Sequence, residues 1–298
     1  MGYGGYSHVA HTELLKERGT SGQPVFTQHE CHPLMNPRGV RVRESRDSAD
    51  HPHSLAVVFA LDVTGSMGGI PRALATDEMP RFMKILEDAR VPDPQLLFMA
   101  IGDANSDAAP LQVGQFESTA ELMDRWLTWS YLEGGGGPGI EESYELGLYF
   151  VAQHTEADCF VKRGKRGYLF MTGDEKPYPV VSRHTVETVI GDRLDEDLAL
   201  PAVIAALSEE WHPFFLIPDD ASRRARCERT WRDLLGDHVL LVPTTADICF
   251  VAAGALVITE GIVKDEAQLA ATLSGAGLAH DRLGPVIQAL RPLLDLRR

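Results

Sequence analysis

The sequence predicts an α/β fold, a doubly wound and mostly parallel sheet with helices on both of its faces. Five short apolar runs recur along the 298 residues, and segments with helical periodicity lie between them. Strands of a parallel sheet are buried on both faces, so they read as continuous apolar runs. Strands that alternate with helices are typical of this architecture. The five runs are Leu55–Leu61, Leu96–Ile101, Tyr168–Met171, Phe214–Ile217 and Val239–Val242.

The segments between the runs supply the helices in order. Pro71 suits the first turn of a helix that begins after Gly69, and Ser118–Glu121 matches a capping box that opens another helix. Residues 111–116 are expected to form a short edge strand. Apolar stripes predict helices at Met79–Leu86, Leu122–Tyr131, Tyr144–Val151, Val203–Trp211 and Cys227–Leu235, followed by two C-terminal helices of which the last carries Leu283–Leu294.

Charge and composition narrow the possible functions. The formal net charge is −15, and because residues 1–53 are neutral overall, the whole excess lies in the remainder. An acidic body disfavours nonspecific nucleic-acid binding and docking on anionic membranes. No apolar stretch approaches the length of a membrane helix, and the first residues lack the pattern of a signal peptide. The four scattered cysteines read as free thiols, so we expect a cytoplasmic protein.

One large domain is expected rather than two. Residues 1–53 hold six of the eleven histidines and no long apolar period, which predicts an irregular N-terminal arm. A zinc site at His29, Cys31 and His32 is a weaker alternative, because their spacing matches no established pattern. Residues 54–262 form the predicted α/β domain, and residues 263–298 form C-terminal helices packed on it.

A polar motif follows the first apolar run directly. Asp62 ends that run, and Thr64 and Ser66 follow on a tight glycine-containing turn. Open α/β sheets bind ligands at the carboxyl ends of their strands. One carboxylate and two hydroxyls at such a place are oxygen donors that suit a hard cation such as Mg²⁺. The structural alternative is that Thr64 or Ser66 caps the next helix.

Other runs also end close to aspartates, at Asp103, Asp174 and Asp219. Right-handed crossovers bring the carboxyl ends of parallel strands to one edge of the sheet. A single aspartate at such a place is usually a turn former. Four of them at one edge predict an acidic surface that attracts cations.

The stretch Asp62-Val63-Thr64-Gly65-Ser66 resembles the metal-ion-dependent adhesion site of von Willebrand factor A (VWA) domains, whose signature is Asp-x-Ser-x-Ser. The turn Gly134–Gly139 resembles the family's second metal loop, and Phe170–Asp174 resembles the third. The second loop lacks the usual Thr, with Ser143 as the nearest hydroxyl, and the third has its Asp displaced by one residue. The resemblance covers residues 54 to about 262 and implies a Rossmann-like VWA fold.

The resemblance also implies a function and a set of site residues. It implies Mg²⁺ or Mn²⁺ held by Asp62, Thr64 and Ser66, with Asp174 and Asp103 binding directly or through water. It further implies a protein–protein interaction module rather than an enzyme, in which an Asp or Glu of the partner completes the metal shell. The partner would meet a rim formed by Gly135, Gly136, Gly137 and Glu175.

An enzymatic alternative rests on the same stretch. Asp62-Val63-Thr64-Gly65-Ser66 also resembles the nucleophile motif of haloacid-dehalogenase-type phosphatases, and Gly173-Asp174 resembles their Mg²⁺-binding pair. Position 178, where a further acid is expected, holds Tyr178. The required lysine has no clear place, although Lys162 and Lys165 are candidates. A scaffold without metal is the third interpretation.

Overall fold

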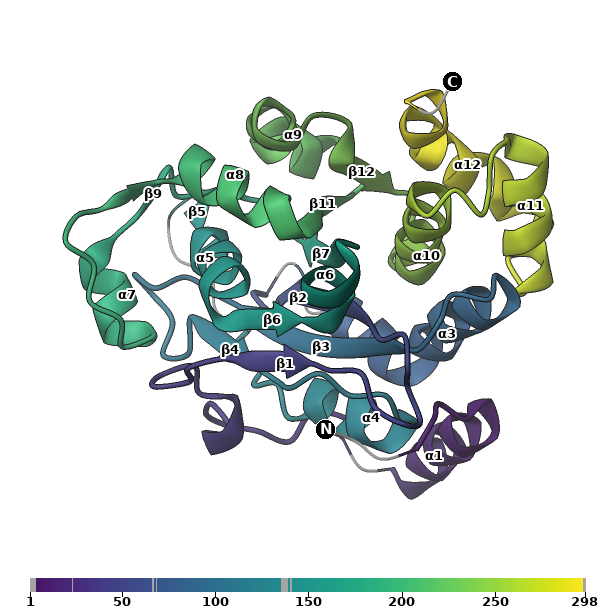
Figure 1. Cartoon of the computed structure of the whole chain (residues 1–298), viewed down its shortest axis with the longest axis horizontal. Coiled ribbons are helices and arrows are strands. Elements are labelled where there is room, and N and C mark those ends of the chain that lie inside the picture. The colour runs from purple at the N-terminus through teal and green to yellow at the C-terminus, as the bar shows by residue number, and fades with distance from the viewer. Residues whose placement is uncertain are drawn as a thin grey trace.

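A six-stranded sheet forms the centre of the molecule (Figure 1). The computed structural model describes residues 4–22, 24–65, 67, 69–134, 139 and 141–296. The strand order is β12-β11-β7-β2-β3-β4, in which only β4 runs antiparallel to its neighbour. The strands are β2 (Leu55–Asp62), β3 (Pro94–Ile101), β4 (Leu111–Val113), β7 (Gly167–Thr172), β11 (Trp211–Pro218) and β12 (Val239–Val242). The predicted doubly wound, mostly parallel sheet is therefore confirmed.

Helices cover both faces of this sheet. In Figure 1, α5 and α8 lie on one side of it, and α3, α10 and α12 lie on the other. The helices are α1 (His8–Ser21), α2 (Gly69–Ala73), α3 (Met79–Asp88), α4 (Ala120–Thr128), α5 (Tyr144–His154), α6 (Asp158–Arg163), α7 (Arg183–Val189), α8 (Leu200–Glu210), α9 (Ala221–Leu235), α10 (Ile248–Thr259), α11 (Glu266–Gly275) and α12 (His280–Asp295). Short strands pair outside the sheet: β1 (Arg43–Ser45) with β6 (Thr155–Ala157), β5 (Glu141–Glu142) with β8 (Lys176–Pro177), and β9 (Val180–Val181) with β10 (Leu198–Ala199).

Burial explains why these segments take these forms. Every side chain of β2 is buried, as expected for a central parallel strand. Helix α5 is buried over most of its length and passes close to β3 at Gly147, where a Cβ atom would crowd Ile101. Helix α4 begins at Ala120, because the hydroxyl of Thr119 accepts the backbone N–H of Leu122.

The N-terminal segment is packed along the domain. Helix α1 contacts α4 and α3, and its Arg18 forms an ion pair with Asp124 and donates to the carbonyl oxygen of Ala75. Further along, β1 pairs in parallel with β6. The segment predicted as an irregular arm thus contains a helix of 14 residues. The division into residues 1–53, 54–262 and 263–298 stays a prediction.

All four cysteines are free, as predicted. Within the described parts of the chain, no helix combines the length and the apolar character that crossing a bilayer requires.

Candidate functional site

Asp62 is the last residue of β2, and its side chain is fully buried at the carboxyl end of the sheet. Its Oδ1 accepts the backbone N–H of Thr64 at 2.9 Å and the Thr64 hydroxyl at 2.5 Å. Its Oδ2 accepts the hydroxyl of Tyr144 at 2.5 Å. Burial raises the pKa of Asp62 to about 6; the hydrogen bonds from Thr64 and Tyr144 oppose the rise, and the charge of Asp174 adds to it.

Asp174 and Glu175 follow β7 at the same edge. Asp174 is buried, and its Oδ2 lies 3.6 Å from the guanidinium of Arg223. Glu175 forms an ion pair of 2.6 Å with Arg226, also on α9. Helix α9 therefore brings two arginines to the carboxylates that follow β7.

Asp103 follows β3 and is held mainly within its own loop. Its Oδ1 accepts the hydroxyl of Tyr178 at 3.0 Å and the backbone N–H of Asn105 at 3.2 Å. The hydroxyl of Ser143 lies at the limit of hydrogen bonding, 3.5 Å from the same oxygen. Asp103 thus already accepts hydrogen bonds from other groups of the protein. One of its neighbours, Ser143, is the residue that precedes α5.

Two buried glutamates near this edge, Glu142 and Glu145, were not predicted from the sequence as site residues. Burial, followed by the charges of Asp62 and Asp103, raises the pKa of Glu142 to about 9. Burial also raises the pKa of Glu145 to about 8. In each of them Oε2 is buried and has no hydrogen-bond partner among the described residues. No pattern marks them in the sequence, because acidic residues at the start of a helix are common for reasons of the helix dipole alone.

The predicted site residues separate into two groups. Asp62, Thr64, Asp103, Asp174 and Glu175 lie in the loops at one edge of the sheet, after β2, β3 and β7. The other predicted residues, Ser66, Gly135, Gly136 and Gly137, lie outside the described residues. Among those described, no group of three or more His, Cys, Asp or Glu side chains is arranged to hold a metal ion. A cation here would depend on hydroxyl ligands as well as carboxylates.

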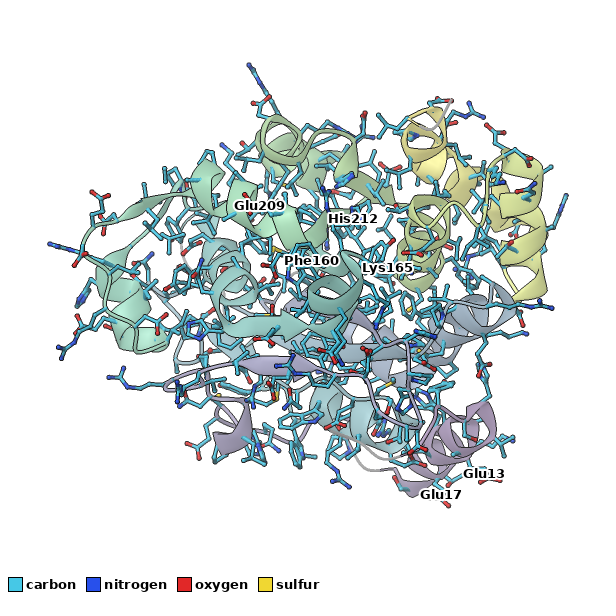
Figure 2. The ribbon with its side chains drawn as sticks, in the orientation of Figure 1. Glu13, Glu17, Phe160, Lys165, Glu209 and His212 are labelled. Carbon is cyan, nitrogen blue, oxygen red and sulfur yellow. The ribbon has the colours of Figure 1, made fainter. Side chains whose placement is uncertain are left out.

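The two lysines named for the phosphatase alternative bind carboxylates elsewhere. Lys162 pairs with Asp47 and Asp158. Lys165, labelled in Figure 2, precedes β7 and pairs with Glu260 at 2.6 Å. Because β7 is parallel to β2, Lys165 belongs to the edge of the sheet opposite Asp62. Neither lysine is placed to offset charge on a phosphoryl group at Asp62.

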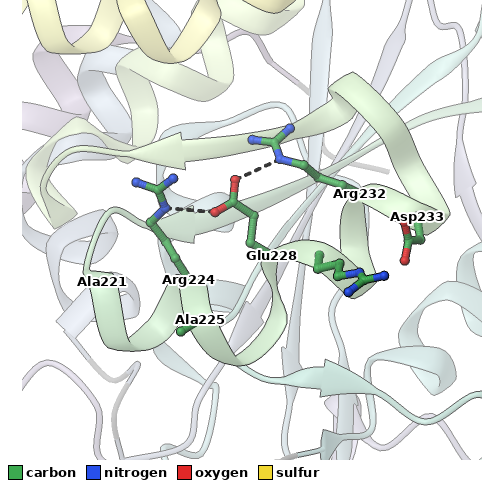
Figure 3. A pocket seen from close by; sticks show the side chains of 7 residues that line it. Ala221, Arg224, Ala225, Glu228, Arg232 and Asp233 are labelled. Carbon is green, nitrogen blue, oxygen red and sulfur yellow. Dashed lines mark hydrogen bonds and ion pairs between the residues drawn. The ribbon is translucent and has the colours of Figure 1, made fainter.

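The outer face of α9 bears an open hollow of about 700 Å³. There Glu228 is held between Arg224 and Arg232, at 2.9 and 2.8 Å (Figure 3). All the residues that line the hollow come from α9, and none is a predicted site residue. The hollow is therefore a feature of one helix surface, separate from the loops around Asp62.

Comparisons with known proteins give distant likenesses only. No family model and no curated protein matches the sequence. Among solved structures, proximal thread matrix protein 1 from the mussel byssus is 12% identical with a TM-score of 0.44, over 76% of this chain and 51% of that one. The same protein with a "zinc occupied MIDAS motif" gives 12% and 0.43 over the same shares. The pilus adhesin SpaC from Lactobacillus rhamnosus GG gives 12% and 0.46, over 74% and 31%.

This chain thus spans about half the length of the mussel protein and about a third of the adhesin. At such identities and TM-scores, the likenesses carry no conclusion about the site, and the fold class rests on the sheet itself.

Proposed function

We propose that this chain is a divalent-cation-dependent protein-binding module of the VWA type. Asp62 and Thr64, with Ser66 from the same turn, would hold Mg²⁺ or Mn²⁺. Asp174 and Asp103 would bind the cation directly or through water. The observation that carries the proposal is the buried carboxyl group of Asp62 at the carboxyl end of the central strand, hydrogen-bonded by hydroxyl and amide donors.

The donor groups present suit a hard cation. The Thr64 hydroxyl gives its only proton to Oδ1 of Asp62, so its oxygen offers only lone pairs to a further ligand. Carboxylate and hydroxyl oxygens are the ligands that Mg²⁺ and Mn²⁺ prefer. Burial and the charge of Asp62 raise the pKa of nearby Glu142, and a divalent charge would favour the ionised form of such an acid.

A bound cation would supply a positive charge with a ligand position that a partner can fill. The residues of this chain would hold the cation and exclude water from its inner side, where Asp62 is buried. A carboxylate from a partner protein would then complete the shell. The proposal does not include catalysis, because Lys162 and Lys165 are both paired with carboxylates away from Asp62.

The first experiment measures cation binding by titration calorimetry with Mg²⁺ and Mn²⁺. Asp62→Asn keeps the shape of the side chain but removes its charge, so we expect affinity to fall roughly 100-fold or more. Asp88→Asn is the matched control, since Asp88 is an exposed residue at the end of α3 that pairs with Lys84. No measurable binding by the native chain, or equal binding by Asp62→Asn, would refute the proposal.

A second experiment asks whether the bound ion keeps an open position. Water-proton relaxation by bound Mn²⁺ reports exchangeable water on the ion. Acetate, or a short peptide containing glutamate, should lower that relaxation in the native protein by replacing water. A bound Mn²⁺ with no exchangeable water would contradict the proposed role of a partner carboxylate, even if cation binding itself depended on Asp62.

A further inference from the structure

Tyr144 connects the Asp62 loop to the start of α5. It is the first residue of α5 and is fully buried, and its hydroxyl donates to Oδ2 of Asp62 at 2.5 Å. The two residues are 82 positions apart in the sequence. Sequence periodicity marks Tyr144 only as an apolar member of a helix stripe. The structure instead places its polar end on the carboxylate at the centre of the proposed site.

The Tyr144 hydroxyl occupies space that the residue at position 173 leaves open. A Cβ atom at Gly173 would collide with this hydroxyl and with the adjoining ring carbons. Gly173 is the residue after Thr172, where the third loop of the resembling family carries its aspartate. In this chain that aspartate is displaced to Asp174, and the phenol of Tyr144 fills the vacated volume.

The ring of Tyr144 is held in place by aromatic neighbours. It meets Phe215 edge-on at 5.3 Å and Trp231 at 5.6 Å between ring centroids. Phe215 and Trp231 stack on each other at 3.7 Å. The indole of Trp231 also donates to the carbonyl oxygen of Glu175. Such packing fixes the ring, so the hydroxyl meets Asp62 at little further cost in conformational entropy.

The hydrogen bonds leave Asp62 one way to bind a cation. Oδ1 already accepts two donors from Thr64, which use both of its lone pairs. Oδ2 accepts one donor, from Tyr144, and keeps a second lone pair. A carboxylate oxygen can accept a hydrogen bond and bind a metal or a metal-bound water at the same time. The phenol therefore orients the oxygen that remains available.

We propose that Tyr144 is a positioning residue of the cation site, an inference that rests on the proposed function. The ring of Tyr144 packs against Phe215 and Trp231, and its hydroxyl lies close to Gly173. The hydroxyl thereby orients Oδ2 of Asp62 for cation binding. It takes over the volume that a side chain at position 173 would fill. It also ties the start of α5 to the loops that follow β2 and β7, so these three segments hold one geometry.

The test compares two tyrosines of α5 that lose the same atom. Tyr144→Phe removes the hydrogen bond to Asp62, and Tyr149→Phe removes the 2.7 Å bond from buried Tyr149 to Asp192. Mn²⁺ titration should show affinity lowered roughly 10- to 100-fold in Tyr144→Phe, the usual cost of losing a group that orients a metal ligand. Tyr149→Phe should stay within about threefold of native affinity, although both variants lose a hydrogen bond from a buried tyrosine to a carboxylate, and with it some stability.

A spectroscopic measurement distinguishes a role of Tyr144 in positioning Asp62 from a role in the stability of the fold alone. Mg²⁺ itself does not absorb, so its addition should perturb the tyrosine absorption band through the Asp62–Tyr144 contact in the native chain and in Tyr149→Phe. Tyr144→Phe should show no such difference spectrum. If Tyr144→Phe does not fold, Gly173→Ala displaces the hydroxyl while keeping the phenol, and we expect it to weaken Mn²⁺ binding about tenfold or more.

The outcomes are distinguishable. Unchanged Mn²⁺ affinity in Tyr144→Phe, with native binding that depends on Asp62, would overturn the positioning role and leave the proposed function intact. Tighter binding in Tyr144→Phe would also overturn it, because the phenol would then compete with the cation for Oδ2. Absence of Asp62-dependent binding in the native chain would refute the proposed function, and this inference with it.

Discussion

Aspartates lie near both ends of β2 in opposite electrostatic settings: half-buried Asp47 and buried Asp158 near its amino end, and buried Asp62 at its carboxyl end. At the amino end, Asp47 accepts the backbone N–H and the hydroxyl of Ser54, the residue before β2. Asp158 of α6 lies in the same cluster, and both aspartates form ion pairs with lysine and arginine side chains. The ion pairs are Asp47 with Lys162 and Arg163, and Asp158 with Arg46 and Lys162. These contacts hold the pKa of both carboxyl groups below the usual range, against the effect of burial.

At the carboxyl end, hydroxyls and further acids surround the carboxylate. Asp62 is hydrogen-bonded by Thr64 and Tyr144, and burial raises its pKa to about 6. Nearby Glu142 has its pKa raised to about 9, by burial and then by neighbouring acids. The chain thus supplies the counter-charge at one end of the strand and leaves an excess of negative charge at the other. An external cation would be attracted most strongly to the end that carries this excess of negative charge.

The largest expected effect is a loss of stability with rising pH, caused by Glu145 at the acidic end. Its pKa of about 8 is raised from 4.5, so the folded state binds the extra proton and stability falls as pH rises towards 8. From pH 6 to pH 9 in EDTA, this group alone should lower the free energy of unfolding by roughly 2–3 kcal/mol. Urea unfolding at both pH values measures it.

Glu145→Gln is the matched variant, because the amide resembles the protonated acid. Its stability should change less with pH, by that same amount, and it should exceed native stability at pH 9. Equal pH dependence in the variant and the native chain would mean that Glu145 is ionised in the folded state near its ordinary pKa.

A second prediction concerns the ion-paired end. Asp158→Ala removes the carboxylate that binds Arg46 and Lys162, and it also removes the acceptor for the backbone N–H of Asp47. Breaking a fully buried pair costs about 3–5 kcal/mol. Both cations reach solvent here, so we expect a loss of about 2 kcal/mol in urea unfolding. Mn²⁺ affinity should be unchanged, and a change in that affinity would mean that the two ends of β2 are coupled.

The fold could be predicted largely because its central strands are buried on both faces. The five apolar runs became β2, β3, β7, β11 and β12, since continuous apolarity is what a parallel sheet requires. Helix α10 was not predicted as a separate element. Its sequence is apolar on every side, and all but its last residue are buried, so it has no amphipathic period to reveal it.

Among the described residues, the sequence marked only those candidate site residues that follow an apolar run, namely Asp62, Thr64, Asp103, Asp174 and Glu175. Asp62 and Thr64 form one turn, and the structure joins them by two hydrogen bonds. Tyr144, Glu142 and Arg223 reach this edge through tertiary packing. A tyrosine in an apolar stripe and an arginine in a charged helix look the same in sequence whether or not they meet a site. The order of the strands and the close approach of Tyr144 to Gly173 show which of these residues lie near the site.

The smallest expected effect tests whether the acidic end carries excess negative charge. Arg226 pairs with Glu175 and also acts on the charge of Asp174, and its side chain is 44% exposed. Arg226→Ala should change stability by less than about 1 kcal/mol, because exposed ion pairs contribute little. Removing this positive charge should tighten Mn²⁺ binding about two- to threefold at low salt, because it removes a Coulomb repulsion that is doubled for a divalent ion.

Arg224→Ala provides the matched control, because Arg224 lies on the outer face of the same helix, where it pairs with Glu228 (Figure 3) and also with Asp219. Its removal should leave Mn²⁺ affinity unchanged within about 1.5-fold, since its charge is already balanced by two carboxylates. The gain in Arg226→Ala should also fade at high salt, because ionic screening weakens interactions between exposed charges. Equal gains in both variants would mean that cation affinity follows the overall net charge, and the distinction between the two ends of β2 would then have no part in setting that affinity.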